Sequence, residues 1–187
     1  HAGMLATCVA CGWATDESYL NRDHELQKLI TAMMPEMIGE EVANIVVDGC
    51  GAPAHAMTLV GLARGFRSVA MAKAGSPARV VGDAMREYPQ MVGGPARDVS
   101  LLIAGISGLV AKDGAEGVYA AALPDGRAIA LKIADGSNRA RPPLMRAALI
   151  ALGVDVSGVD ERAFSSPIFG HGKIVGEVRV VDNLLST

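Results

Sequence analysis

The chain has 187 residues, of which half are apolar and a fifth are charged, and its formal net charge is −3. These values are typical of a globular protein and give no basic surface for nucleic acid. Arg64, Arg67 and Lys73 interrupt the longest apolar helical segment, so no run of about 20 apolar residues could cross a membrane. Small molecules and further copies of the chain are therefore the expected partners.

The cysteine content points to a reducing compartment. Three cysteines, Cys8, Cys11 and Cys50, are an odd number and too few for a disulfide scaffold. We therefore expect the cytoplasm. A chain of this length can bury the core of one domain, so we expect a single domain over residues 1–187, with two small domains as the alternative.

The first residues read as an apolar helix, over 1–14, that has neither a capping residue nor an initiator methionine before it. We therefore expect the chain to begin part-way through an element, as the C-terminal part of a longer domain. Apolar spacing then predicts a helix over 24–34, which Pro35 ends, and a buried strand over 42–47.

The turn at residues 48–53, Asp-Gly-Cys-Gly-Ala-Pro, is expected to join that strand to a long helix over 54–74. Its glycines allow a sharp turn that presents Asp48 and Cys50, and Pro53 suits the first turn of a helix. The positive end of a helix dipole favours a carboxylate or a thiolate. We expect chemistry here, and the alternative is an ordinary Gly-rich turn with a buried cysteine.

The rest of the chain alternates between helix and strand signals. The remaining expected helices cover residues 79–87, 97–104 and 139–152. The remaining expected strands cover residues 118–123, 127–134 and 173–181. Pro124-Asp125-Gly126 lies between the first two of these strands and predicts a β-hairpin. Hairpin strands with helices before and after them predict an α+β fold, an antiparallel sheet flanked by helices.

Within this hairpin, alternation places Lys132 on the same face as Ala128, Ala130 and Ala134. Small neighbours leave room for a ligand, and an amine held in such a recess loses its proton more easily. The alternative is a solvated lysine on an edge strand.

Several other residues have two interpretations each. Glu116, in a Gly-Ala-Glu-Gly loop, binds substrate groups or caps backbone N–H groups. Cys8 and Cys11 join Cys50 in a three-thiol metal site, or are two small buried residues. Arg97 and Asp98 either form a local ion pair or, as the default, lie on a solvated face. The histidines are interpreted as structural or solvated.

Four segments occur together in a known order: His1–Thr7, Asp48–Pro53, Lys112–Val118 and Ala130–Ala140. The opening His-Ala-Gly-Met-Leu-Ala-Thr looks like the segment that follows a Cys-Ser-Gly-Lys element. Together these motifs resemble the bacterial type II L-asparaginase family, the group that contains the Rhizobium-type zinc-associated enzymes, over nearly the whole chain.

The resemblance implies the fold of the serine β-lactamases and glutaminases, a homodimer, and hydrolysis of L-asparagine by a serine that a lysine activates. It assigns Lys132 as the catalytic lysine and Cys50 as a zinc ligand. It places Asp48 near the substrate amine, Glu116 in the wall of the cleft and His1 next to a zinc-binding lysine. The Ser-x-x-Lys nucleophile is expected in a preceding segment, so this chain alone should be inactive. The alternative function is a non-catalytic zinc-binding or structural module centred on Cys50.

Overall fold

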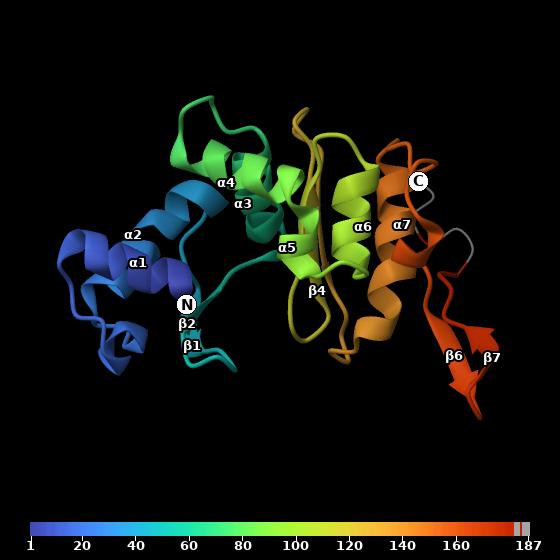
Figure 1. Ribbon diagram of the computed structural model, residues 1–187, viewed down its shortest axis with the longest axis horizontal. Coiled ribbons are helices and arrows are strands. Elements are labelled where there is room, and N and C mark those ends of the chain that lie inside the picture. Colours follow the sequence, from blue (N-terminus) through green and yellow to red (C-terminus); the bar gives the residue numbers. More distant parts are fainter. Residues whose placement is uncertain (182–183, 185–187) are drawn as a thin grey trace. The chain divides into compact units, whose positions relative to one another are not determined.

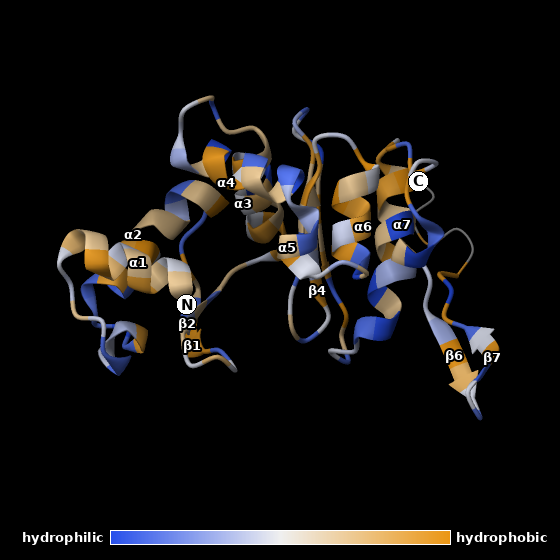
Figure 2. Ribbon diagram, in the orientation of Figure 1, coloured by the Kyte–Doolittle hydropathy of each residue, from blue (hydrophilic) through white to orange (hydrophobic). Residues whose placement is uncertain are grey.

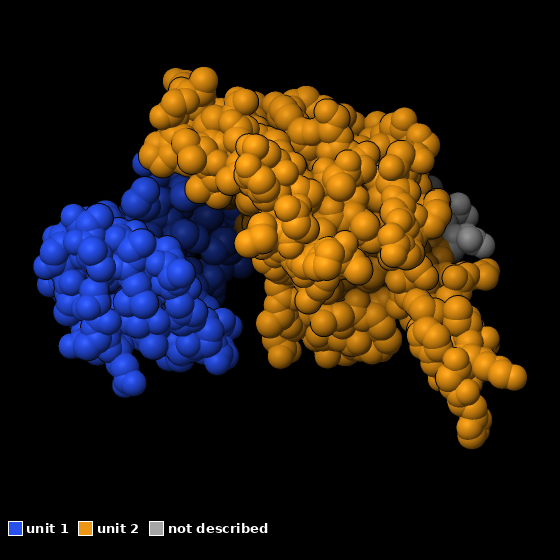
Figure 3. All heavy atoms as spheres, viewed as in Figure 1, with its two compact units in different colours: residues 1–61 blue, residues 62–187 orange. Residues whose placement is uncertain are grey.

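The computed structural model describes residues 1–181 and Leu184, and Figure 1 follows their helices and strands along the chain. The chain divides into two compact units, residues 1–61 and 62–187, which are coloured separately in Figure 3. The expectation of a single domain over 1–187 stays a prediction.

Unit 1 begins with two helices, α1 (Ala2–Cys11) and α2 (Glu25–Ile38), joined through a 3-10 turn, η1 (Glu17–Leu20). His24 caps α2, because its Nδ1 accepts a hydrogen bond from the Leu26 N–H at 3.2 Å.

The expectation that Pro35 ends this second helix is wrong, since Pro35 lies inside α2. Pro35 is only three residues from the helix end, so the missing N–H removes one hydrogen bond from the last turn. Burial of Ile38, which is 2% exposed, offsets that loss and keeps the last turn helical.

The turn at 48–52 joins two strands of a hairpin. β1 (Asn44–Val47) pairs antiparallel with β2 (Pro53–Ala56), with Asn44 opposite Ala56. The expected helix start at Pro53 is therefore wrong. The first position of an edge strand tolerates a proline as well as a helix start does. The expected burial of β1 is also wrong, because Val46 and Val47 are exposed.

The helix expected over 54–74 is shorter in the structure. α3 (Leu59–Ala70) begins at the end of unit 1 and continues into unit 2. Thr58 precedes it, and its Oγ1 accepts a hydrogen bond from the Gly61 N–H at 2.9 Å. The same hydroxyl donates to the Glu40 carboxylate at 2.7 Å, which fixes the start of the helix.

Unit 2 is built on a three-stranded antiparallel sheet in the order β3-β4-β5. Its strands are β3 (Val110–Asp113), β4 (Val118–Ala122) and β5 (Ala128–Lys132). The predicted hairpin is confirmed, with Ala122 opposite Ala128 and Val118 opposite Lys132. The sequence did not predict β3, which pairs with the other edge of β4.

One face of this sheet carries the main core. It packs against α6 (Asp98–Gly105) and α7 (Arg141–Ala151), and Leu102, Tyr119 and Leu149 are fully buried there. Figure 2 shows apolar residues along β4 and on parts of α6. Both helices were predicted from the sequence. A 3-10 turn, η2 (Asn138–Ala140), precedes α7, and Ser137 caps this turn.

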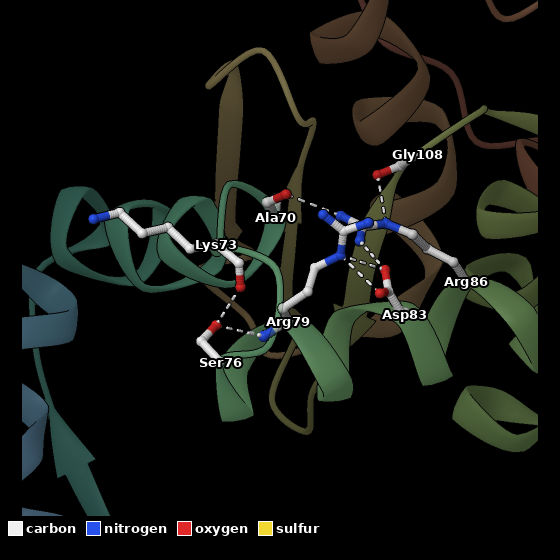
Figure 4. A network of polar contacts seen from close by, with 7 residues as sticks. All are labelled: Ala70, Lys73, Ser76, Arg79, Asp83, Arg86 and Gly108. Carbon is white, nitrogen blue, oxygen red and sulfur yellow. Dashed lines mark hydrogen bonds and ion pairs between the residues drawn. The ribbon is translucent and has the colours of Figure 1, made fainter.

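The opposite face is covered at one end by α3 and α4 (Pro77–Glu87), where Ala70, Val110 and Ala122 are buried. Arg86 fixes this arrangement, as Figure 4 shows. Its guanidinium donates to the Ala70 carbonyl at 3.0 Å and to the Gly108 carbonyl at 2.9 Å. One arginine side chain thus joins the end of α3, α4 and the loop before β3.

The remaining elements are short. They are α5 (Pro89–Gly93), η3 (Glu161–Ala163) and the strands β6 (Pro167–Gly170) and β7 (Lys173–Glu177). The strand expected over 173–181 ends at Glu177, and β6 pairs with it as a further hairpin. Small antiparallel sheets flanked by helices confirm the α+β prediction. Within the described part of the chain, every helix is too short or too polar to cross a bilayer.

Candidate functional site

The face of the central sheet opposite the main core carries two lysines on a floor of alanines. Lys112 lies opposite Ala120, and Ala120 lies opposite Ala130, so these three residues form one cross-strand row. Lys132 follows two positions after Ala130 and therefore points to the same face. The expectation that Lys132 shares a face with Ala128 and Ala130 is confirmed, while Ala134 lies beyond the end of β5. The direct cross-strand neighbour of Lys132 is Val118, and Lys132 is exposed on an edge strand of this sheet, as the alternative interpretation had it.

Lys132 and Glu116, two of the predicted site residues, are brought together. The Lys132 Nζ donates hydrogen bonds to the main-chain carbonyls of Glu116 and, at 3.0 Å, Ile133. Glu116 has a left-handed backbone, with φ +57°, which is costly for a residue that has a side chain. The lysine therefore holds the strained turn between β3 and β4 against the end of β5.

Glycines allow two loops to approach at this point. A Cβ on Gly117, which has φ +70°, would lie 2.7 Å from the Ile133 Cβ. A Cβ on Gly136 would lie 2.6 Å from the Glu116 Oε2. The loops at 114–117 and 133–136 thus pack backbone against backbone around the Lys132 amine.

A charged cluster that the sequence did not predict surrounds Asp113, at the end of β3. Its carboxylate accepts from Lys112 Nζ at 2.8 Å, from Arg141 Nη1 at 3.3 Å and from Arg97 Nη2. The alternative of a local pair between Arg97 and Asp98 is wrong. Arg97 precedes α6 with an extended backbone, so it reaches the sheet, and Asp98 lies in the first helical turn.

Burial and neighbouring charges act in opposite directions on the pKa of Asp113. Burial acts to raise the pKa of Asp113, but the Lys112 hydrogen bond and the charges of Lys112, Arg97 and Arg141 outweigh it and lower that pKa. Burial also raises the pKa of Tyr119, so its hydroxyl stays protonated. The Arg141 guanidinium lies 5.5 Å from the centre of the Tyr119 ring, within cation–π range.

In unit 1, Asp48 and Cys50 lie together in the β1–β2 turn. The pKa of the Asp48 carboxyl is lowered by a hydrogen bond from the Cys50 side chain and by a second one from the Gly49 N–H. Cys50 is exposed, so the alternative of a buried cysteine at this turn is wrong.

His1 and this turn flank the same 3-10 element of unit 1. The His1 Nδ1 lies 2.6 Å from the Tyr19 hydroxyl, and a Cβ on Gly51 would lie 3.4 Å from Leu20 Cδ1. A cavity of about 430 Å³ lies beside η1 and the hairpin. Its lining residues are Leu20, Asn21, Arg22, Asp23, Ile45, Val46, Val47, Gly51 and Pro53.

The donors near Cys50 do not complete a zinc site. Zinc in proteins normally takes about four ligands, whereas this turn offers one thiol and one carboxylate. Among the residues that the structure describes, there is no group of three His, Cys, Asp or Glu side chains suited to a metal ion. Cys8 is buried in α1, while Cys11 and Cys50 are exposed, and all three are free.

Of the remaining histidines, His55 and His24 have structural contacts. The His55 Nε2 lies 2.8 Å from the Thr31 hydroxyl, which links β2 to α2, and burial lowers the pKa of His55. His24 caps α2, and His171 lies in the tight turn between β6 and β7.

The protein is thus an α+β protein whose central antiparallel sheet presents two lysines beside Gly-rich loops. Residues 1–180 match the family model described as L-asparaginase II, and the chain belongs to this family. No curated protein matches the chain. Family membership supports an asparaginase-like amidohydrolase function.

Proposed function

We propose that the protein hydrolyses L-asparagine to L-aspartate and ammonia through a serine that a lysine activates. The observation that carries the proposal is the family match over residues 1–180. The two lysines on the alanine face of the sheet add a chemical basis, because a neutral lysine amine can take the proton of a serine.

In the proposed reaction, the serine Oγ attacks the side-chain amide carbon of asparagine while its proton passes to the lysine amine. Backbone N–H groups stabilise the oxyanion of the tetrahedral intermediate. The C–N bond then breaks, and ammonia leaves with a proton returned by the lysine. Water hydrolyses the resulting ester and releases aspartate. No Ser-x-x-Lys motif occurs in the 187 residues, so the proposal includes a nucleophile from a segment outside them.

Lys132 is the proposed base. Two of its three N–H donors are directed at main-chain carbonyls, which hold the nitrogen at one end of the alanine face. Glu116 shapes the turn next to it and is proposed to contact the substrate through its carboxylate. His1 and Asp48 are further proposed substrate-binding residues, with Asp48 as the carboxylate that receives the α-ammonium group.

Activity measurements on lysine variants test this assignment. We would change Lys132 and, separately, Lys112 to alanine in a polypeptide that includes the Ser-x-x-Lys segment, with Lys173→Ala on the exposed β7 as the control. Lys132→Ala should reduce kcat for L-asparagine by about 100-fold or more, the usual contribution of a general base. Full kcat in Lys132→Ala would contradict the role of this lysine and leave the overall reaction standing.

Three further properties belong to the proposal. The resemblance to the asparaginase family supports a homodimer, which sedimentation velocity would test. It also supports a zinc ion near Cys50, with the missing ligands supplied from outside the described residues. Three free cysteines support a reducing compartment such as the cytoplasm.

A further inference from the structure

We propose that the pair Asp48-Gly49 is a site of spontaneous covalent modification, at which the aspartate converts to isoaspartate. The chain contains four Asp-Gly pairs, which start at Asp48, Asp113, Asp125 and Asp135. Asp-Gly pairs favour this reaction because glycine has no Cβ to shield its main-chain nitrogen. Three features of the fold distinguish the first pair from the other three.

The reaction needs only water and the atoms of the pair. The Gly49 nitrogen attacks the side-chain carbon, Cγ, of Asp48, and the new C–N bond closes a five-membered imide. One carboxylate oxygen leaves as water, with the amide proton and a proton from solvent. Water then opens the imide at the main-chain carbonyl and a proton is released. The chain now continues through the former side-chain carboxyl group, and its mass is unchanged.

The first feature is the position of the attacking nitrogen. The Gly49 N–H donates a hydrogen bond to the Asp48 carboxylate, so the nitrogen already lies beside its target. Intramolecular attack is fastest when the reacting atoms are held close together before the reaction. At the other three pairs the glycine N–H donates to a main-chain carbonyl instead: Gly114 to Val118 at 2.9 Å, Gly126 to Leu123 at 3.0 Å and Gly136 to Ile133 at 3.0 Å. Attack there first requires the loss of a main-chain hydrogen bond.

The second feature is what holds the carboxylate. The Asp48 carboxylate accepts hydrogen bonds from its immediate neighbours, Gly49 and Cys50. The carboxylates of the other pairs are fixed on cations: Asp113 on Lys112, Arg97 and Arg141, Asp125 on Arg127 at 2.7 Å, and Asp135 on Arg139 at 2.6 Å. Those ion pairs must be released before the carboxylate carbon can turn to the following nitrogen.

The third feature is space for the ring. Asp48 and Gly49 are both exposed in the β1–β2 turn, and among the described residues nothing lies within 4 Å of a Cβ added to Gly49. The other three glycines are closely packed, as an added Cβ shows: at Gly114 it would lie 3.3 Å from Val118 Cβ, at Gly126 3.1 Å from Arg67 Nε and at Gly136 2.6 Å from Glu116 Oε2. The imide can therefore form at Asp48 with the least movement of neighbouring atoms.

The modification has a consequence that rests on the proposed function, although the chemical step does not. Isoaspartate adds one methylene group to the main chain and moves the free carboxylate to a new position. If Asp48 receives the α-ammonium group of asparagine, activity should fall in step with the isoaspartate formed at this residue.

Peptide mapping of the aged protein tests the proposal. The chain is kept folded at neutral pH for several weeks, and electron-transfer fragmentation then distinguishes isoaspartate from aspartate at each of the four pairs. We expect isoaspartate to form at Asp48 about fivefold faster than at Asp125 or Asp135, the factor that corresponds to one main-chain hydrogen bond. In urea, where the fold is lost, the four rates should become similar. Circular dichroism shows which samples are folded.

The proposal is overturned if Asp48 is no faster than Asp125 and Asp135 in the folded chain, or if its advantage is the same in urea. Asp48→Glu should abolish the signal at this position, because the longer side chain does not close a five-membered ring. Asp125→Glu is the matched control and should leave the rate at Asp48 unchanged. The same ageing applied to the polypeptide with the Ser-x-x-Lys segment tests the consequence. Isoaspartate at Asp48 with full activity would contradict only the proposed substrate contact of Asp48.

Discussion

The Arg141 guanidinium lies 3.3 Å from the Asp113 carboxylate, and both side chains are almost completely buried. Arg141 also donates to the Gly114 carbonyl at 3.0 Å, so it joins the start of α7 to the loop after β3. A buried charge depends on its partner, because an uncompensated ion in the protein interior is strongly destabilising.

Asp113→Asn should therefore destabilise unit 2 strongly. Removal of the one carboxylate shared by three cations leaves Arg141 buried without a counter-ion, at a cost of about 3–5 kcal/mol. Urea unfolding followed by far-UV circular dichroism measures the change. Asp125→Asn is the control, because Asp125 pairs with Arg127 at the surface, where a pair contributes about 1 kcal/mol or less. Equal losses in the two variants would contradict the importance of the buried pair.

The free energy of unfolding of unit 1 is expected to depend on pH because of His55. Burial lowers its pKa in the folded state below the ordinary value of 6.5. Below about pH 6.5 the unfolded chain then binds more protons than the folded one, so the free energy of unfolding falls as the pH is lowered through this range. The single tryptophan, Trp13, lies in unit 1, and its fluorescence reports the unfolding of that unit.

His55→Gln should remove this part of the pH dependence between pH 5 and 7.5. The measurement is the free energy of unfolding, followed by Trp13 fluorescence at several pH values in this range. The same measurement on His171→Asn, which removes an exposed imidazole, separates the effect of His55 from the loss of any one histidine. A His55→Gln variant with the pH dependence of the parent chain would show that another group is responsible.

The left-handed backbone and close packing of Gly117 predict that a side chain at this position destabilises the loops around Lys132. Gly117→Ala should cost about 1–2 kcal/mol for the left-handed backbone, and a further ~1–3 kcal/mol for the clash with Ile133. Gly172→Ala is the matched control, because Gly172 has φ +75° and nothing lies within 4 Å of an added Cβ. Similar destabilisation of the two variants in thermal unfolding would contradict the close packing of these loops.

Zinc content tests the alternative of a metal-binding module. Because the turn at Asp48 and Cys50 supplies too few ligands, we expect the purified chain to keep much less than one equivalent of zinc after dialysis. Elemental analysis measures this, with Cys50→Ser and the exposed Cys11→Ser compared side by side. One equivalent of zinc that is lost only in Cys50→Ser would favour a zinc-binding module instead.

The sequence predicted those elements that are determined by residues only a few positions apart. The hairpin around Pro124-Asp125-Gly126 was predicted because alternation and turn residues act over a few positions. The same alternation placed Lys132 beside the alanines. The β1–β2 hairpin was missed because Pro53 suits both a helix start and the first position of an edge strand.

The Asp113 cluster could not be predicted in the same way, because its members are distant in sequence. Arg97 is 16 residues and Arg141 is 28 residues from Asp113. Only the pairing of β3 with β4 and the packing of α6 and α7 on the sheet bring them together. The adjacent Lys112-Asp113 pair was the one local sign, and adjacent opposite charges are common on solvated surfaces.

Ammonia release from L-asparagine is the most direct test of the proposed reaction. The measurement compares the 187-residue chain with a polypeptide in which a segment carrying the Ser-x-x-Lys motif precedes residue 1. The serine–lysine mechanism predicts steady ammonia release from the longer polypeptide and none above background from the shorter one. Comparable turnover by the 187 residues alone would contradict the serine–lysine mechanism, and no release from the folded longer form would contradict the asparaginase function itself.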